Sequence, residues 1–140
     1  MTGGLLMDTC ALIWIGALAG ETHLGPAEDA MNEARAKGQP ICISPISAWE
    51  IGLLVAKGRI PMSMSPKTWL DAAIGSKGLI WSEMPVDVLL ASATLPGEIH
   101  ADPADRIIIA TAREYGMRLV TRDRRILDYA AKGHLLALAC

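Results

Sequence analysis

Five acidic residues stand where a carboxylate can do chemistry. Asp8 follows a short apolar run near the start of the chain, and Asp123 follows another near its end. Asp102 and Asp105 open an apolar helical pattern, whereas Glu50 lies within a different one. Because no clustered cysteines or histidines accompany them, these oxygens would select Mg²⁺ or Mn²⁺ over softer metals. Such an ion polarises a phosphate and lowers the pKa of a bound water, so the pattern indicates metal-dependent phosphodiester chemistry.

Glu50 is the acidic residue that is hardest to explain as part of the fold alone. Of the residues three and four positions away, which are its neighbours on a helix, only Ser47 is polar. Glu50 therefore projects from the stripe that should face the core, where an unpaired carboxylate is costly. It needs a cation, and we favour a metal ion over the alternative, a salt bridge to an arginine such as Arg106.

Each of the other four acidic residues also has a structural interpretation. Asp8 can cap the helix that follows it, and Asp123 can serve as a turn residue. Asp102 precedes Pro103 and is a good N-cap. Asp105, in the first turn of the same helix, gains from the helix dipole. We rank Asp102 below Asp105 as a site residue, because the cap already accounts for it.

The elements that must position these residues alternate along the chain. Short apolar runs predict strands at residues 5–7, 41–43, 79–81, 119–121 and 135–138. Apolar stretches bounded by proline and glycine predict helices at residues 11–18, 26–37, 45–57, 66–74, 86–93, 102–115 and 126–131. This alternation predicts an α/β fold with a parallel sheet covered on both faces. Ligands bind such sheets beyond the carboxyl ends of the strands, where Asp8 and Asp123 are expected.

Length and composition narrow the class of protein. The 140 residues predict a single domain spanning residues 1–140. Hydrophobic residues make up 51% of the chain and charged residues 20%, which excludes a disordered chain. The uncharged run 9–20 is too short to cross a bilayer, and no lysine or arginine precedes Arg35, so we expect neither a membrane span nor a signal peptide. Three cysteines without a paired motif fit a reducing compartment, and we expect a cytoplasmic protein.

Four segments carry the acidic residues, namely residues 6–12 (LMDTCAL), 46–51 (ISAWEI), 100–106 (HADPADR) and 119–123 (LVTRD). In this order and spacing they resemble the PIN-domain ribonucleases, and among these the VapC-type toxins of bacterial toxin–antitoxin pairs. The resemblance covers nearly the whole chain. One departure is Ala104, where many relatives carry phenylalanine, and this should affect local packing rather than the chemistry.

The resemblance implies a PIN-like three-layer α/β/α sandwich with a central, mainly parallel sheet, and an Mg²⁺- or Mn²⁺-dependent endoribonuclease. The catalytic and metal-binding residues that it implies are Asp8, Glu50, Asp105 and Asp123. Thr9, Thr121 and Asp102 would not bind the metal themselves but would orient the metal ligands or a water molecule through hydrogen bonds. His100 is placed near the site by resemblance, and we favour a capping or hydrogen-bonding role for it over a general base.

Basic residues are concentrated toward the end of the chain. Residues 1–105 contain six basic and twelve acidic residues, whereas residues 106–140 contain seven basic and three acidic ones. An RNA backbone is negatively charged, so basic residues beside an acidic site would help the protein to bind it. The candidate RNA contacts are Arg106, Arg122, Arg124 and Arg125. Alternatively, these arginines are ordinary solvent-exposed surface residues that do not bind RNA.

Apolar surface is expected to serve protein partners. The mean hydropathy of +0.31 is high for a soluble protein, and the predicted helices 11–18 and 26–37 carry enough apolar surface to form a groove. By resemblance, a VapC-type toxin binds a cognate VapB-type antitoxin there and forms a homodimer. The four tryptophans are interpreted as core or interface anchors rather than as a base-stacking platform.

Other functions fit parts of the pattern. A response-regulator receiver needs an acidic pair after its first strand, but here Asp8 is followed by Thr9. A haloacid-dehalogenase-like phosphatase needs the motif DxDxT, which Cys10 breaks. The remaining alternative is a degenerate PIN-like module that binds RNA or protein without catalysis. We rank it below the enzyme, because all four acidic positions are present.

Overall fold

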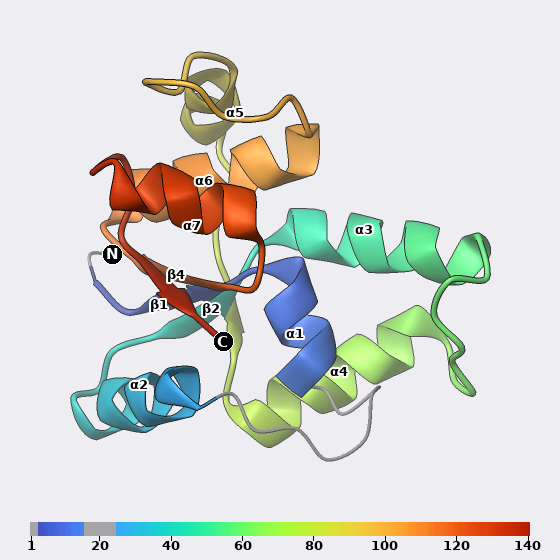
Figure 1. Ribbon diagram of the computed structural model, residues 1–140. Helices are drawn as coiled ribbons and strands as arrows, with labels where there is room; N and C mark the ends of the chain where they lie inside the picture. The colour runs from blue at the N-terminus through green and yellow to red at the C-terminus, as the bar shows by residue number, and fades with distance from the viewer. Residues whose placement is uncertain (1–2, 16–24) are drawn as a thin grey trace.

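The computed structural model describes residues 3–15 and 25–140, in which a five-stranded sheet lies between helices (Figure 1). The strands are β1 (Leu5–Met7), β2 (Ile41–Ile43), β3 (Ile80–Trp81), β4 (Arg118–Thr121) and β5 (Ala137–Ala139). Every pairing between them is parallel, and their order is β3-β2-β1-β4-β5. The predicted α/β class and parallel sheet are confirmed.

Local sequence explains where the helices begin and end. The helices are α1 (Thr9–Ile15), α2 (Pro26–Ala36), α3 (Pro45–Ala56), α4 (Pro66–Lys77), α5 (Val86–Ala93), α6 (Pro103–Tyr115) and α7 (Arg124–Ala131). Ser44 and Ser65 cap α3 and α4 through their side chains, and each is followed by a proline that suits the first turn. Gly78 and Gly116 end α4 and α6 in the left-handed conformation that glycine adopts without strain.

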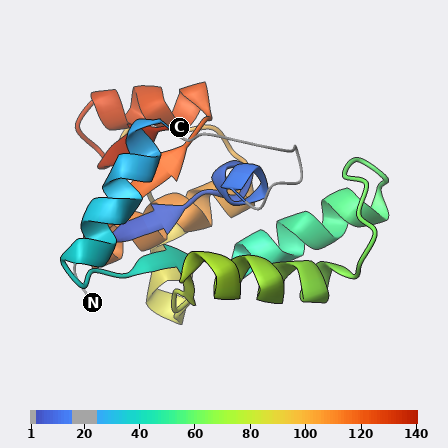
Figure 2. The ribbon, with the colours of Figure 1, turned by 90° about the horizontal axis from the view of Figure 1, so that it is seen from below.

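The sheet is buried on both faces, so the molecule has three layers. Along β1, Leu5 and Met7 pack in a cluster with α1, α2 and α4, whereas Leu6 packs in a second cluster with α5, α6 and α7. Successive strand residues point to opposite faces, and here both faces are apolar. Figure 1 shows the two sets of helices on opposite sides of the strands, and Figures 1 and 2 both show α3 alongside α4 at one flank.

Several predicted boundaries differ from the structure by one or two residues, and the helix predicted at residues 66–74 continues for three more residues to Lys77, where Gly78 ends it. The last strand was predicted at residues 135–138, but β5 is Ala137–Ala139, because its register pairs Ala137 with Leu119 while Leu135 packs in the core. The last helix begins at Arg124 rather than at residue 126, because Asp123 caps it.

The helix predicted at residues 11–18 begins at Thr9 and is described as far as Ile15, so its last predicted positions lie outside the described residues. Within the described ranges, no helix has the length and apolar character that crossing a bilayer requires.

Candidate metal centre

The acidic residues meet at the carboxyl ends of β1 and β4. The chain leaves β1 for β2 and β3 on one side and returns to β4 on the other, which makes this edge a topological switch point of the kind that binds ligands. A depression of about 360 Å³ lies there. It is lined by Asp8, Thr9, Cys10, Ile13, Glu50, Leu54, Asp105, Arg122 and Asp123. All four carboxylates expected to bind metal therefore border one space.

Asp8 is a buried carboxylate, with only 4% of the residue exposed. Its Oδ1 accepts the backbone N–H of Thr9 at 2.8 Å. Its Oδ2 accepts the Thr121 hydroxyl at 2.6 Å and the Cys10 thiol at 3.4 Å. Burial raises the pKa of Asp8 in spite of these three donors. The donors fix the orientation of the carboxylate without supplying a positive charge.

Glu50 extends from α3 into the same depression. Its Oε1 accepts the Thr9 hydroxyl at 2.5 Å, and that hydroxyl oxygen lies 2.8 Å from the Ser47 Oγ. Burial, together with the charges of neighbouring carboxylates, raises the pKa of Glu50 to about 7. No arginine or lysine of the described residues forms an ion pair with Glu50. The alternative of a salt bridge from Arg106 to Glu50 is therefore wrong.

Arg106 uses its guanidinium group on backbone carbonyls instead. Its Nε donates to the carbonyl of Ser92 at 2.9 Å, and its Nη2 donates to that of Ala93 at 3.4 Å. Its Nη1 donates to the carbonyls of Ile99 and His100 at 3.4 and 3.5 Å. These bonds tie the end of α5 and the following loop to α6. The geometry favours this structural role for Arg106 over the predicted RNA contact.

Asp102 and Asp105 occupy the start of α6 and have different roles. Asp102 is the N-cap, as predicted, and its Oδ1 accepts the backbone N–H of Asp105 at 3.0 Å. Burial raises the pKa of Asp105, and a hydrogen bond with His100 opposes this effect. One carboxylate oxygen from each of Glu50, Asp102 and Asp105 lies within 4.8 Å of the other two. Asp102 thus caps the helix and also borders the acidic group.

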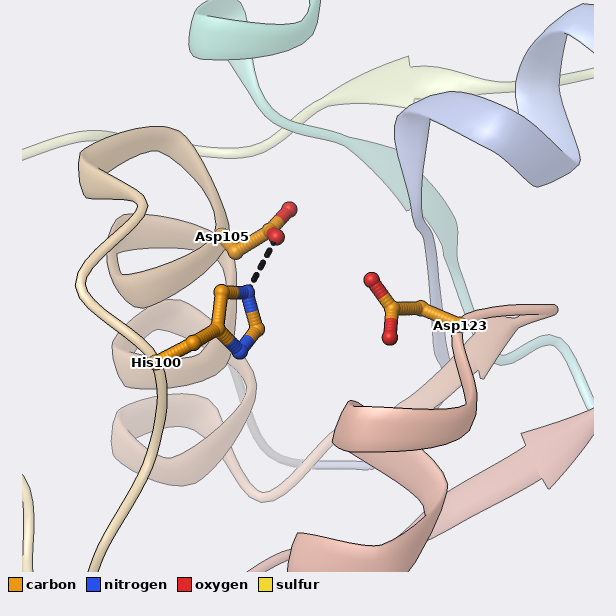
Figure 3. A group of neighbouring side chains, drawn as sticks. All are labelled: His100, Asp105 and Asp123. Atoms are coloured by element: carbon orange, nitrogen blue, oxygen red, sulfur yellow. Dashed lines mark hydrogen bonds and ion pairs between the residues drawn. The ribbon is translucent and has the colours of Figure 1, made fainter.

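Asp123 approaches Asp105 from the other side of the site. It caps α7 by accepting the backbone N–H of Arg125 at 2.8 Å, and the Arg125 guanidinium lies 3.4 Å from its Oδ2. Burial alone would raise the pKa of Asp123, but these bonds lower it. Figure 3 shows Asp123 facing Asp105 and His100, and ligand atoms of the three lie within 4.8 Å of one another.

Asp105 is therefore common to two groups of potential ligands, one with Glu50 and Asp102 and the other with His100 and Asp123. Asp8 belongs to neither group, although its charge contributes to the raised pKa values of Glu50 and Asp105.

Two further residues of this site were not predicted. Ser47 lies three residues before Glu50, on the same side of α3, and Cys10 lies two residues after Asp8 in the first turn of α1. The three-residue spacing of Ser47 from Glu50 on one helix is a signal that could have suggested it. The spacing of two residues between Asp8 and Cys10 gives no such signal. Burial and the charge of Asp8 raise the pKa of the Cys10 thiol to about 12, so it is a hydrogen-bond donor at neutral pH and not a nucleophile.

Arg122 borders the depression, and its guanidinium carbon lies 4.1 Å from the ring centroid of Trp14. This distance is typical of a cation–π contact. Arg124 and Arg125 are exposed at the start of α7. Of the other tryptophans, Trp69 is buried in the core as interpreted from the sequence, whereas the remaining two are exposed.

The donor set fits a hard divalent ion. Several carboxylates share one depression, and among residues 3–15 and 25–140 no basic side chain is paired with Asp8 or Glu50. Carboxylates in such proximity raise one another's pKa values, and a divalent cation removes that penalty. The predominance of oxygen ligands favours Mg²⁺ or Mn²⁺.

Comparison with known proteins gives relatives in sequence and in fold. The PIN domain family model matches residues 5–132. Ribonuclease VapC22 of Mycobacterium tuberculosis is 33% identical over 103 residues, which cover 71% of this chain and 75% of that protein.

Two solved structures resemble the whole fold. One is VapBC2 from Rickettsia felis bound to a DNA fragment from its promoter, with a TM-score of 0.66, 16% identity, and coverage of 96% of this chain and 97% of that chain. The other is DNA-bound VapBC from Salmonella typhimurium, with a TM-score of 0.66, 17% identity, and coverage of 99% and 98%.

Proposed function

Since this chain belongs to the PIN-domain family and is related to a VapC ribonuclease, we propose that it is a metal-dependent endoribonuclease that acts as the toxin of a toxin–antitoxin pair. One observation carries the proposal. Asp8, Glu50, Asp105 and Asp123, from four separate segments, border one depression, and within the described chain neither Asp8 nor Glu50 has a basic partner. Such a site is stable with all carboxylates ionised only when a cation fills it.

The proposed metal ion would be bound by four carboxylates, and hydrogen bonds from neighbouring groups fix the orientation of Asp8 and Glu50. Mg²⁺ or Mn²⁺, bound by oxygens of Asp8, Glu50, Asp105 and Asp123, would polarise the RNA phosphate and lower the pKa of a water molecule. Thr121 and the Thr9 N–H fix Asp8, and the Thr9 hydroxyl fixes Glu50. The chain supplies no side-chain nucleophile in this proposal.

Arg122 is the basic residue best placed to meet the RNA backbone. It lines the same depression as the carboxylates, and its contact with Trp14 restricts where its guanidinium lies. A guanidinium is suited to hydrogen-bond phosphate oxygens. We propose that Arg122 binds a phosphate beside the cleaved bond, and that Arg124 and Arg125 add to the positive surface.

Cleavage of a labelled RNA tests the proposed activity. We expect cleavage in Mg²⁺ or Mn²⁺, none in EDTA, and a loss of several orders of magnitude for Asp8→Asn. Asp87→Asn, at an exposed position of α5, is the matched control and should cleave like the wild type. Cleavage that persists in EDTA or in Asp8→Asn would contradict the metal-nuclease mechanism. RNA binding in Mn²⁺ without any cleavage would favour the degenerate binding module.

An antitoxin would bind an apolar hollow away from the carboxylates. A hollow of about 550 Å³ is lined by residues that include Ile15, Met62, Met64 and Trp69. The groove was predicted at the helices of residues 11–18 and 26–37, and a second hollow of about 380 Å³ lies there, lined by Ile15 and by residues of α2 that include Met31. The 550 Å³ hollow shares Ile15 with it, extends along α4, and is lined by the larger apolar side chains. Apolar surface of this kind is typical of partner sites.

Co-expression with the product of the neighbouring reading frame tests this partner. We expect the two proteins to co-purify, and Met64→Asp to weaken their association. Leu136→Asp is the matched control, since Leu136 is also apolar and exposed but lies in the segment before β5 and lines neither this hollow nor the carboxylate depression. If the two chains purify separately, the toxin–antitoxin part of the proposal is wrong.

The exposed Val86 and Leu90 on α5 support the proposed homodimer. Light scattering should therefore show a lower mass for Val86→Asp than for the wild type, and equal masses would contradict this choice of surface.

A further inference from the structure

His100 is held beside the acidic residues by contacts that lie outside them. It belongs to the loop before α6, and its backbone carbonyl and that of Ile99 both accept from Arg106 Nη1. Arg106 is the residue that follows Asp105 on α6. One arginine therefore fixes the loop to the same helical turn that carries Asp105, and this sets the position of the imidazole relative to that carboxylate.

The two ring nitrogens of His100 have different surroundings. Nε2 lies 2.6 Å from Asp105 Oδ2, whereas Nδ1 is buried and has no hydrogen-bond partner among the described residues (Figure 3). A proton on Nδ1 would have no acceptor, whereas a proton on Nε2 faces a carboxylate. The surroundings thus select the neutral tautomer that carries its proton on Nε2 and donates it to Asp105.

Little water competes for this hydrogen bond. The side chains of His100 and Asp105 are only 13% and 15% exposed. The bond uses one of the two lone pairs of Asp105 Oδ2 and holds the carboxylate in place, and Oδ1 has no part in the bond to His100. Because Asp105 is the carboxylate shared by both ligand groups, its orientation affects the whole centre.

We propose that His100 is a positioning residue of the metal centre, which orients the Asp105 carboxylate toward a divalent ion through its Nε2–H. The inference rests on the proposed metal-dependent function. Partners behind metal ligands act in this way in other proteins, and their loss typically costs about 10- to 100-fold in metal affinity. His100 takes no part in proton transfer to or from RNA in this role.

Direct ligation of the ion by His100 Nε2 is the competing arrangement, and it predicts different behaviour. A ring nitrogen that binds a metal cannot also donate a hydrogen bond to Asp105. An imidazole ligand would also shift the preference of the site toward Zn²⁺ and Ni²⁺.

Mn²⁺ binding to the full-length protein, followed by electron paramagnetic resonance or calorimetry, tests the proposal without relying on activity. We expect His100→Ala to weaken Mn²⁺ binding about 10- to 100-fold. His100→Gln should restore binding to within a few-fold of the wild type, because its amide N–H can replace Nε2–H. His134→Gln is the matched control, since that ring stacks on Tyr129 and should leave Mn²⁺ affinity unchanged.

The variants separate this inference from the proposed function. If Asp105→Asn binds Mn²⁺ as tightly as the wild type, the proposed metal centre itself is wrong. If Asp105→Asn loses binding while His100→Ala keeps it, only the positioning role is wrong. Should His100→Ala fail to fold in EDTA, His100→Asn replaces it, because its shorter side chain offers a donor near the Nδ1 position rather than the Nε2 position.

Nitrogen-15 NMR of the histidine rings gives a second readout. The metal-free protein should show His100 protonated on Nε2, and this proton should remain after Mg²⁺ is added. Loss of the Nε2 proton on addition of Mg²⁺, or a proton on Nδ1 in the metal-free protein, would overturn the proposal.

Discussion

The Thr9 hydroxyl donates a hydrogen bond of 2.5 Å to Glu50 Oε1, which joins the first turn of α1 to the middle of α3. Thr9 has a single hydroxyl proton, so the Ser47 hydroxyl, 2.8 Å away, must donate to Thr9 in turn. The backbone N–H of Thr9 meanwhile donates to Asp8. One threonine therefore fixes two of the carboxylates that we assign to the metal centre.

The stability of the metal-free protein should fall as the pH rises from about 4.5 to 7. The pKa of Glu50 is raised from 4.5 to about 7 in the folded protein, so the folded state binds this proton more tightly than the unfolded chain does. The resulting stabilisation is fully present below the unfolded pKa and is lost as the pH passes the folded value. Urea unfolding in EDTA measures this loss. Glu50→Gln should flatten the profile, and an unchanged profile would contradict the assignment.

Divalent ions should stabilise the wild type more strongly at pH 8 than at pH 5.5. Binding requires ionised carboxylates, and burial raises the pKa values of Asp8, Glu50 and Asp105. At 100 times the dissociation constant, binding to the folded state alone contributes about 2.7 kcal/mol. The melting temperature with and without Mn²⁺ measures this effect. Asp105→Asn should reduce the increase, and Asp71→Asn, an exposed control on α4, should not. Equal increases in both variants would count against the site.

Thr121→Val should impair both folding and cleavage. The Thr121 hydroxyl donates to Asp8 at 2.6 Å and accepts the backbone N–H of Asp123 at 3.0 Å, so valine removes one partner from each acidic residue. Leaving such groups unsatisfied costs about 1–3 kcal/mol. Thr111→Val is the matched control, because Thr111 is equally buried but its hydroxyl bonds to the Ile107 carbonyl of its own helix. Urea unfolding and RNA cleavage distinguish the two, and equal loss of cleavage in both would refute a special role for Thr121.

Arg122→Gln should weaken RNA binding at low salt and should reduce the slope of log affinity against log salt by about 1. The expected cause is the loss of one phosphate contact beside the carboxylates. Arg118→Gln is the matched control, since Arg118 is an exposed arginine at the start of β4, the end of that strand remote from the site. Filter binding of an uncleaved RNA in EDTA, repeated at several salt concentrations, measures this slope for the wild type and for each of the two variants. If the slope for Arg122→Gln equals that of the wild type, the arginine belongs to the solvated surface.

Local sequence patterns were sufficient to predict the elements and the types of residue at the site. Apolar runs, caps and helix-ending glycines are local signals, and within residues 3–15 and 25–140 they predicted the strands and helices to within a few residues. The rule that parallel strands present their carboxyl ends at one edge brought Asp8 and Asp123 to the same side of the sheet before any coordinates were known. The apolar helical neighbours of Glu50 indicated that its carboxylate needs a cation, and the resemblance of the four acidic segments to one family assigned Glu50 and Asp105 to the same site as Asp8 and Asp123.

Which side chains meet at the site depends on how segments distant in the sequence pack together. The strand order sets β4 beside β1, and this brings Thr121 to Asp8 across 113 positions of the chain. Arg106 contacts carbonyls rather than Glu50, and His100 contacts Asp105, because the loop before α6 folds back onto that helix. Periodicity and capping report contacts between residues a few positions apart, whereas hydrogen bonds between distant segments depend on packing that no local pattern encodes.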